Sequence, residues 1–135
     1  MPLRISRKHV SDLLRWAEDA GNRECCGLLM GRDNTVSEVE LCDNIAVNPE
    51  THFELDAAVL LSRHKLAREG GAPILGYFHS HPNGLAQPSS VDIKQAAADD
   101  RFWLIIAEAN ITAWQPRAKE QRVVEFESVP ILVEG

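Results

Sequence analysis

Residues 74–92 read ILGYFHSHPNGLAQPSSVD, and this stretch combines a predicted strand, a loop and the beginning of a predicted helix. The apolar run at 74–81 predicts a buried strand that ends at Pro82. Asn83-Gly84 suits a tight loop, and the spacing after it predicts a helix over about residues 90–98. A buried strand that leads through a loop into a helix indicates a sheet with helices packed on it.

The remainder of the chain predicts further helices and strands. One predicted helix covers about residues 7–20 with Ser6 as its N-cap, and another lies between Asp56 and Gly70. Predicted strands occupy residues 26–30, 35–42, 102–107, 111–114 and 121–127, and residues 52–55 are a candidate for a short additional strand. These elements place the chain in the α/β (α+β) class, as a mixed central β-sheet flanked by helices. Because the chain has 135 residues and no linker between elements, we expect one domain over residues 1–135.

Composition limits the classes of partner. The chain has 14 Lys and Arg residues against 20 Asp and Glu residues, a net charge of -6, so it lacks the basic field that nucleic-acid binding needs. It has no apolar run of about 18 residues, so we expect no membrane span or anchor. The odd number of cysteines, Cys25, Cys26 and Cys42, argues against a secreted disulfide framework and favours a cytoplasmic location.

Residue types that bind metals cluster at one place in the sequence. Side chains two residues apart on a strand point to the same face, so His79 and His81 can aim their imidazoles at one point. Asp92 follows in the first turn of the next predicted helix, where the helix dipole favours the ionised carboxylate. Two imidazoles and one carboxylate are a suitable ligand set for catalytic zinc, which leaves its fourth position for water.

The same residues also fit other interpretations. Ser89-x-x-Asp92 is also the pattern of a helix capping motif, and a solitary histidine is usually a surface or core residue. The H-x-H pair followed by a carboxylate favours metal binding over capping alone. The motifs H-E-x-x-H, G-x-S-x-G and P-C-x-x-C are absent from the sequence, which excludes helix-borne zinc proteases, serine hydrolases of the elbow type and zinc nucleobase deaminases.

Three motifs together resemble the JAMM metalloprotease signature of the MPN (Mov34/PAD-1) family. They are Glu24 with CGLLMG at 26–31, GYFHSHP at 76–82, and Pro88-Ser89-x-x-Asp92. The similarity covers about residues 8–110, with no departure at the ligand positions. The resemblance implies a cytidine-deaminase-like MPN/JAB fold of the compact prokaryotic type.

The resemblance also implies a role for each motif residue. His79, His81 and Asp92 are expected to hold one zinc ion per chain. Glu24 lies near the start of a predicted strand, where an isolated glutamate is far more often a solvated charge than a catalyst, but the resemblance implies that it acts as general base and then general acid. Ser89 is expected either to stabilise the oxyanion or to serve only as a helix cap. The alternative is a non-catalytic MPN scaffold, which would be expected to have lost one of the four residues that bind zinc or act as base.

The resemblance implies a substrate class. Family members cleave peptide or isopeptide bonds that follow the C-terminal tail of ubiquitin-like proteins, and they hold this tail as an added strand. In its short length the chain resembles the compact prokaryotic members, some of which act on small β-grasp or sulfur-carrier proteins. The sequence leaves open the identity of the carrier, the residue after the cleaved bond and the oligomeric state. It also leaves open whether the loop with His52 and Phe53 borders the cleft.

Overall fold

The computed structural model describes residues 2–135, apart from the side chain of Val124. Within this range the chain forms helices α1 (Arg7–Ala20), α2 (Ala57–Arg68) and α3 (Ser90–Gln95). The strands are β1 (Leu3–Ser6), β2 (Cys26–Arg32), β3 (Thr35–Cys42), β4 (Ile74–Ser80), β5 (Phe102–Ala107), β6 (Asn110–Lys119), β7 (Arg122–Val129) and β8 (Ile131–Glu134). None of the helices in the described range is long and apolar enough to cross a membrane.

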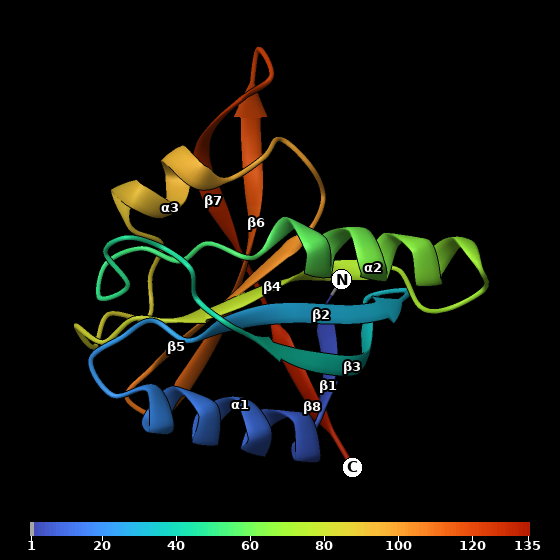
Figure 1. Cartoon of the computed structure of the whole chain (residues 1–135), viewed down its shortest axis with the longest axis horizontal. Coiled ribbons are helices and arrows are strands. Elements are labelled where there is room, and N and C mark those ends of the chain that lie inside the picture. The colour runs from blue at the N-terminus through green and yellow to red at the C-terminus, as the bar shows by residue number, and fades with distance from the viewer. Residues whose placement is uncertain (1) are drawn as a thin grey trace.

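All eight strands belong to one sheet with the order β7-β6-β5-β4-β2-β3-β1-β8. Strand β4 runs parallel to β5, and β1 runs parallel to β3 and β8, whereas the other neighbours are antiparallel. Figure 1 shows α1 and α2 on opposite faces of this sheet. The expected mixed central sheet with flanking helices is therefore confirmed.

Strand β2 shows how the sequence divides the core between the two faces. Successive side chains of a strand point to opposite faces, and all three apolar residues at positions 28–30 are fully buried. Leu28 and Met30 pack with apolar side chains of α2, whereas Leu29 belongs to the cluster that includes α1. A strand buried on both faces therefore appears in the sequence as a continuous apolar run.

The register between β2 and β4 positions the functional residues. The two strands are antiparallel, and Cys26 lies opposite His79. The segment that precedes β2 therefore lies beside the segment that follows β4. The backbone amide of Ser80 donates to the carbonyl oxygen of Cys25 at 3.0 Å, which continues the pairing by one residue. Glu24 and His81, which are far apart in sequence, are thereby brought to the same end of the sheet.

Several predicted boundaries were accurate and others were wrong. The ranges 7–20, 35–42 and 102–107 are confirmed as α1, β3 and β5. Strands β1 and β8 were not expected, because short terminal strands form only through pairing with distant parts of the chain. Strand β6 is longer than predicted, since it continues to pair with β7 beyond its last contact with β5.

One predicted helix end and one candidate strand differ from the structure. Helix α3 ends at Gln95 instead of residue 98, because Ala96 takes an extended backbone and packs against an aromatic cluster. Residues 52–55 form no strand. Their backbone is instead held by Asn44, whose side-chain oxygen accepts a hydrogen bond from the amide of Glu54 at 3.1 Å. Tertiary contacts override local preference in both places.

Candidate active site

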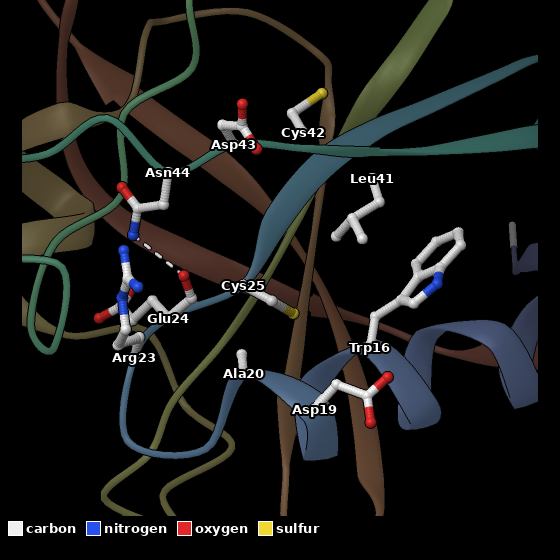
Figure 2. Close-up of a pocket in the computed structure, with 10 residues that line it drawn as sticks. All are labelled: Trp16, Asp19, Ala20, Arg23, Glu24, Cys25, Leu41, Cys42, Asp43 and Asn44. Atoms are coloured by element: carbon white, nitrogen blue, oxygen red, sulfur yellow. Dashed lines mark hydrogen bonds between the residues drawn. The ribbon is translucent and has the colours of Figure 1, made fainter.

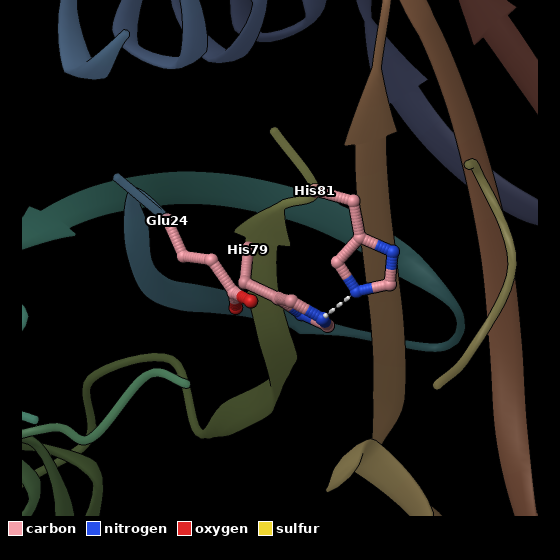
Figure 3. Close-up of side chains that lie close together, drawn as sticks. All are labelled: Glu24, His79 and His81. Atoms are coloured by element: carbon pink, nitrogen blue, oxygen red, sulfur yellow. Dashed lines mark hydrogen bonds between the residues drawn. The ribbon is translucent and has the colours of Figure 1, made fainter. Parts of the chain in front are cut away.

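Two histidines at the end of β4 form the centre of the site. His79 lies within β4 and His81 follows the strand immediately, so their side chains share a face, as predicted. Their Nε2 atoms are 2.9 Å apart, and the side chains are buried, with residue exposures of 0% and 6%. Figure 3 shows the two rings with these nitrogens facing each other. The strand therefore delivers two potential ligand atoms to one point.

Asp92 completes this cluster from α3. Its Oδ1 lies 3.1 Å from Nε2 of His79, and its Oδ2 lies 3.0 Å from Nε2 of His81. Burial opposes ionisation of this carboxyl group, but hydrogen bonds from both imidazoles outweigh burial and hold the pKa of Asp92 well below its usual range. The structure thus brings together the three residues predicted as ligands, with the acid in its charged form.

Asp92 is also a helix-capping residue. The backbone amide of Ser89 donates to Oδ2 of Asp92 at 2.8 Å, and the hydroxyl of Ser89 accepts from the amide of Asp92 at 3.1 Å. This reciprocal pair is a capping box, so the capping interpretation of the sequence is confirmed. It does not compete with metal binding, because each carboxylate oxygen has two lone pairs. The cap instead fixes the orientation of the carboxylate toward the imidazoles.

Glu24 approaches the same cluster from the segment before β2. One of its carboxylate oxygens and the ring nitrogens of His79 and His81 all lie within 4.8 Å of one another. Figure 3 shows its carboxylate directed toward the His79 ring. The residue is buried, and no hydrogen-bond partner for Oε1 occurs in the described part of the chain. Burial raises the pKa of Glu24 to about 7, although the nearby His81 lowers it. The sequence alone could not distinguish this placement from a surface charge.

The donor atoms fit a zinc ion. The Nε2 atoms of His79 and His81 are 2.9 Å apart, and each lies 3.0 to 3.1 Å from one carboxylate oxygen of Asp92. These atoms therefore converge on one small volume. A single cation can accept one lone pair from each of these three residues and keep its fourth position for water. Zinc bonds such atoms at about 2.0–2.2 Å, which separates neighbouring tetrahedral ligands by roughly 3.3 Å, close to the observed spacing. Glu24 supplies a second nearby carboxylate, so the cluster contains more donor groups than a three-residue site requires.

A groove beside the cluster is shown in Figure 2. It has a volume of about 390 Å³ and lies between α1 and the end of β3. Trp16 and Leu41 contribute apolar surface, and Glu24 lies on its wall, whereas His79, His81 and Asp92 do not line it. The groove therefore approaches the cluster from the Glu24 side.

The structure also reveals contacts that sequence reasoning missed. The ring of Phe53 stacks on His79 with centroids 4.5 Å apart, so the loop at 52–53 does border the site. The side-chain amide of Asn44 donates to the backbone carbonyl of Glu24 at 2.9 Å. Figure 2 shows this bond as a dashed line. The sequence left the placement of the 52–53 loop open and did not indicate the Asn44 contact, because both contacts connect segments that are distant along the chain.

Comparison with known proteins is consistent with this geometry. Residues 6–117 match the family described as prokaryotic homologs of the JAB domain. The desampylase of Haloferax volcanii is 29% identical over 102 residues, which are 73% of this chain and 73% of that protein. The tail tip assembly protein K of Escherichia phage N15 is 28% identical over 117 residues, and the chain spans only 46% of its length. The solution structure of protein DSY2949 from Desulfitobacterium hafniense superposes with a TM-score of 0.80 at 28% identity, covering 97% of this chain and 92% of that chain.

Proposed function

Because this chain belongs to the JAMM (JAB/MPN) metalloprotease family, through its prokaryotic JAB homologs, we propose that it is a zinc-dependent peptidase. The bond cleaved is a peptide or isopeptide bond that follows the C-terminal tail of a ubiquitin-like or sulfur-carrier protein. The observation that carries this proposal is the buried convergence of two imidazoles and two carboxylates at the end of β4. Placing this many ionisable groups together in a buried position is costly unless they share a cation.

In this proposal His79, His81 and Asp92 hold the zinc. Asp92 is favoured over Glu24 as the third ligand because its oxygens lie 3.0 and 3.1 Å from the two imidazole nitrogens. Zinc supplies a Lewis acid that lowers the pKa of water to about 7 and polarises a carbonyl group. His81 is oriented for this role by a hydrogen bond between Nδ1 and the backbone carbonyl of Leu85 at 2.8 Å.

Glu24 acts as the general base. Its carboxylate lies beside the ligand cluster and is held there through its own backbone, whose amide donates to the carbonyl of Pro49 at 2.7 Å. From this position it accepts a proton from the attacking water and transfers it to the leaving amine. The free Oε1 atom, for which the described residues provide no partner, leaves a lone pair available for that proton.

Ser89 has a structural role that the capping box demonstrates and a catalytic role that we propose. Its hydroxyl oxygen accepts from the amide of Asp92. The hydroxyl hydrogen is therefore available to donate to the oxyanion of the substrate. The two roles use different parts of the same hydroxyl group and are compatible.

The substrate class rests on similarity to a protein named a desampylase and on the chemistry of the site. The rival function is a non-catalytic scaffold of the same fold. The retained and mutually oriented set of Glu24, His79, His81 and Asp92 argues against that function, because a scaffold has no use for a buried base beside a ligand cluster.

The decisive experiment compares Glu24→Gln with wild type. Zinc-loaded protein is incubated with a β-grasp carrier fused through its C-terminal tail to a second protein, and products are measured by mass spectrometry. Glutamine keeps the shape of the side chain but cannot accept the proton, so we expect zinc to remain bound and turnover to fall about 10²- to 10⁴-fold. Glu69→Gln, an exposed position at the end of α2, is the matched control and should retain full activity.

Two results would count against the proposal. Equal turnover of Glu24→Gln and wild type would remove Glu24 from the mechanism. Failure of zinc-loaded wild type to cleave any carrier fusion would favour the scaffold function.

A further inference from the structure

The two candidate ligand histidines are held in place by different means. Nδ1 of His81 is hydrogen-bonded to the carbonyl of Leu85 at 2.8 Å. Nδ1 of His79 is buried, and the described residues provide no hydrogen-bond partner for it. A metal-binding histidine usually donates this second ring N–H to an acceptor, which fixes the ring and its tautomer. His79 therefore needs another source of orientation.

Aromatic side chains enclose the His79 ring. Phe53 stacks on it with a centroid distance of 4.5 Å and an interplanar angle of 20°. Trp103 of β5 meets it edge-on, at 5.5 Å and 89°. Because His79 has no exposed surface, these contacts restrict rotation of the ring. Stacking fixes the ring plane, and the edge contact from Trp103 limits sliding within that plane.

Phe53 is itself fixed by hydrogen bonds at its backbone. The side-chain amide of Gln95 in α3 donates to the carbonyl of Phe53 at 3.1 Å. Asn44 donates to the carbonyl of the adjacent His52 at 2.9 Å and, with the same nitrogen, to the carbonyl of Glu24. The oxygen of Asn44 accepts from the amides of Ala46 and Glu54 at 3.0 and 3.1 Å. All four hydrogen-bonding positions of this amide are used.

The loop between β3 and α2, which contains Asn44 and Phe53, connects the parts of the site. Through Asn44 it is tied to the backbone of Glu24, and through Gln95 it is tied to the helix that carries Asp92. Through the ring of Phe53 it contacts His79. A displacement of the loop would therefore disturb residues that come from three different segments: the one before β2, strand β4 and helix α3.

We propose that Phe53 is a positioning residue for His79 and replaces the hydrogen bond that His79 Nδ1 lacks. Stacking holds the imidazole plane so that Nε2 faces the nitrogen of His81 and the carboxylate of Asp92. This inference rests on the proposed metal site. It adds a requirement for an aromatic ring at position 53, which an apolar side chain of another shape does not meet.

The test measures zinc affinity by competition with a chelator in wild type, Phe53→Leu and Phe53→Tyr. Phe126→Leu is the matched control, since Phe126 packs on Trp103 with ring centroids at 5.1 Å within the same aromatic cluster. The visible spectrum of the cobalt-loaded proteins reports the geometry of the ligand set, and melting of the metal-free proteins reports stability.

We expect Phe53→Leu to weaken zinc binding by about 10- to 100-fold, the usual effect of losing a group that orients a ligand, and to alter the cobalt spectrum. Phe53→Tyr should restore affinity and spectrum, because it keeps the ring. Phe126→Leu should lower the melting temperature of the metal-free protein as Phe53→Leu does, with zinc affinity unchanged. If Phe53→Leu cannot be purified folded, Gln95→Ala removes an exposed side chain and frees the Phe53 backbone, and it should weaken zinc binding in the same direction.

Other outcomes would overturn the inference. If Phe53→Leu kept wild-type zinc affinity and an unchanged cobalt spectrum, the ring would not position His79. The same conclusion would follow from that result in Gln95→Ala, where this variant replaces Phe53→Leu. An equal loss of zinc affinity in Phe126→Leu would assign the effect to general packing. Absence of zinc binding in wild type would instead refute the proposed metal site, which separates the two failures.

Discussion

At the scale of single residues, the site depends on a small number of atoms. The Nε2 atoms of His79 and His81 lie 2.9 Å apart, and Asp92 contacts both. Each of these side chains is buried, so removal of any one takes a polar partner from the other two at a place where water cannot readily substitute for it. The desolvation cost of the cluster is offset when a cation is shared by all three residues, which links metal binding to stability.

Metal content is predicted by this arrangement. Purified wild-type protein should contain about one zinc ion per chain, and His79→Ala or Asp92→Ala should abolish binding, because three protein ligands are needed for a tight site. His64→Ala is the control, since His64 lies in α2 and outside the cluster, and it should leave the metal content unchanged. Elemental analysis provides the measurement. Zinc retained by the double variant His79→Ala/His81→Ala would place the metal elsewhere.

At the scale of elements, a few helices and strands fix the positions of the site residues and support them from the core. Strand β4 aligns the histidines, and the capping box at the start of α3 directs the carboxylate of Asp92. A side chain at Gly27 in β2 has no room, because an added Cβ would clash with the backbone carbonyl oxygen of Glu40 and with the ring of Phe78. That ring in turn stacks against Trp16 of α1 at 5.9 Å. Helix, strand and site residues are thus connected through one packed core.

The contribution of α1 to this core gives a stability prediction. Leu13 is fully buried among residues of the sheet, so Leu13→Ala should lower the free energy of unfolding by about 2–5 kcal/mol. Leu61→Ala is the matched control in α2, where the side chain is 68% exposed, and its effect should be within about 0.5 kcal/mol. Chemical denaturation of the metal-free proteins measures both. Similar losses in the two variants would contradict the burial assigned to α1.

At the scale of the whole molecule, the sheet order determines how substrate can approach. Strand β4 is paired on one side with β2 and on the other with β5, so a substrate tail cannot pair with β4 itself. The sheet edges, β7 and β8, do not carry the ligand residues. In the proposed function, the substrate tail therefore reaches the site across the end of the sheet, where the candidate ligand side chains are buried and only a narrow segment of chain can approach them.

This restriction predicts a preference for glycine before the cleaved bond. Glycine lets the substrate backbone approach buried ligands closely, and a folded carrier supplies the docking surface that orients the tail. We expect a carrier fusion with a Gly-Gly tail to be cleaved faster than the same fusion with its penultimate glycine changed to leucine, and much faster than the isolated tail peptide. Initial cleavage rates provide the comparison. Similar rates for all three substrates would indicate a general peptidase.

The sequence by itself determined features that depend on local geometry. Period-two alternation placed His79 and His81 on one face, and capping signals located the start of α1 at Arg7 and of α2 at Ala57. The spacing between the histidines and Asp92 also sufficed to predict that these three candidate ligands lie together, as the structure shows. These features are local because each is set by the backbone conformation of neighbouring residues.

Tertiary structure alone decided which distant segments meet. The pairing of β1 with β8 joins the two ends of the chain, and the register of β2 against β4 brings Glu24 to the ligand cluster. The stacking of Phe53 on His79 likewise joins a loop to a strand. The reason is physical: a local pattern specifies which side of an element is apolar, whereas the partner of that side is selected by the packing of the complete core.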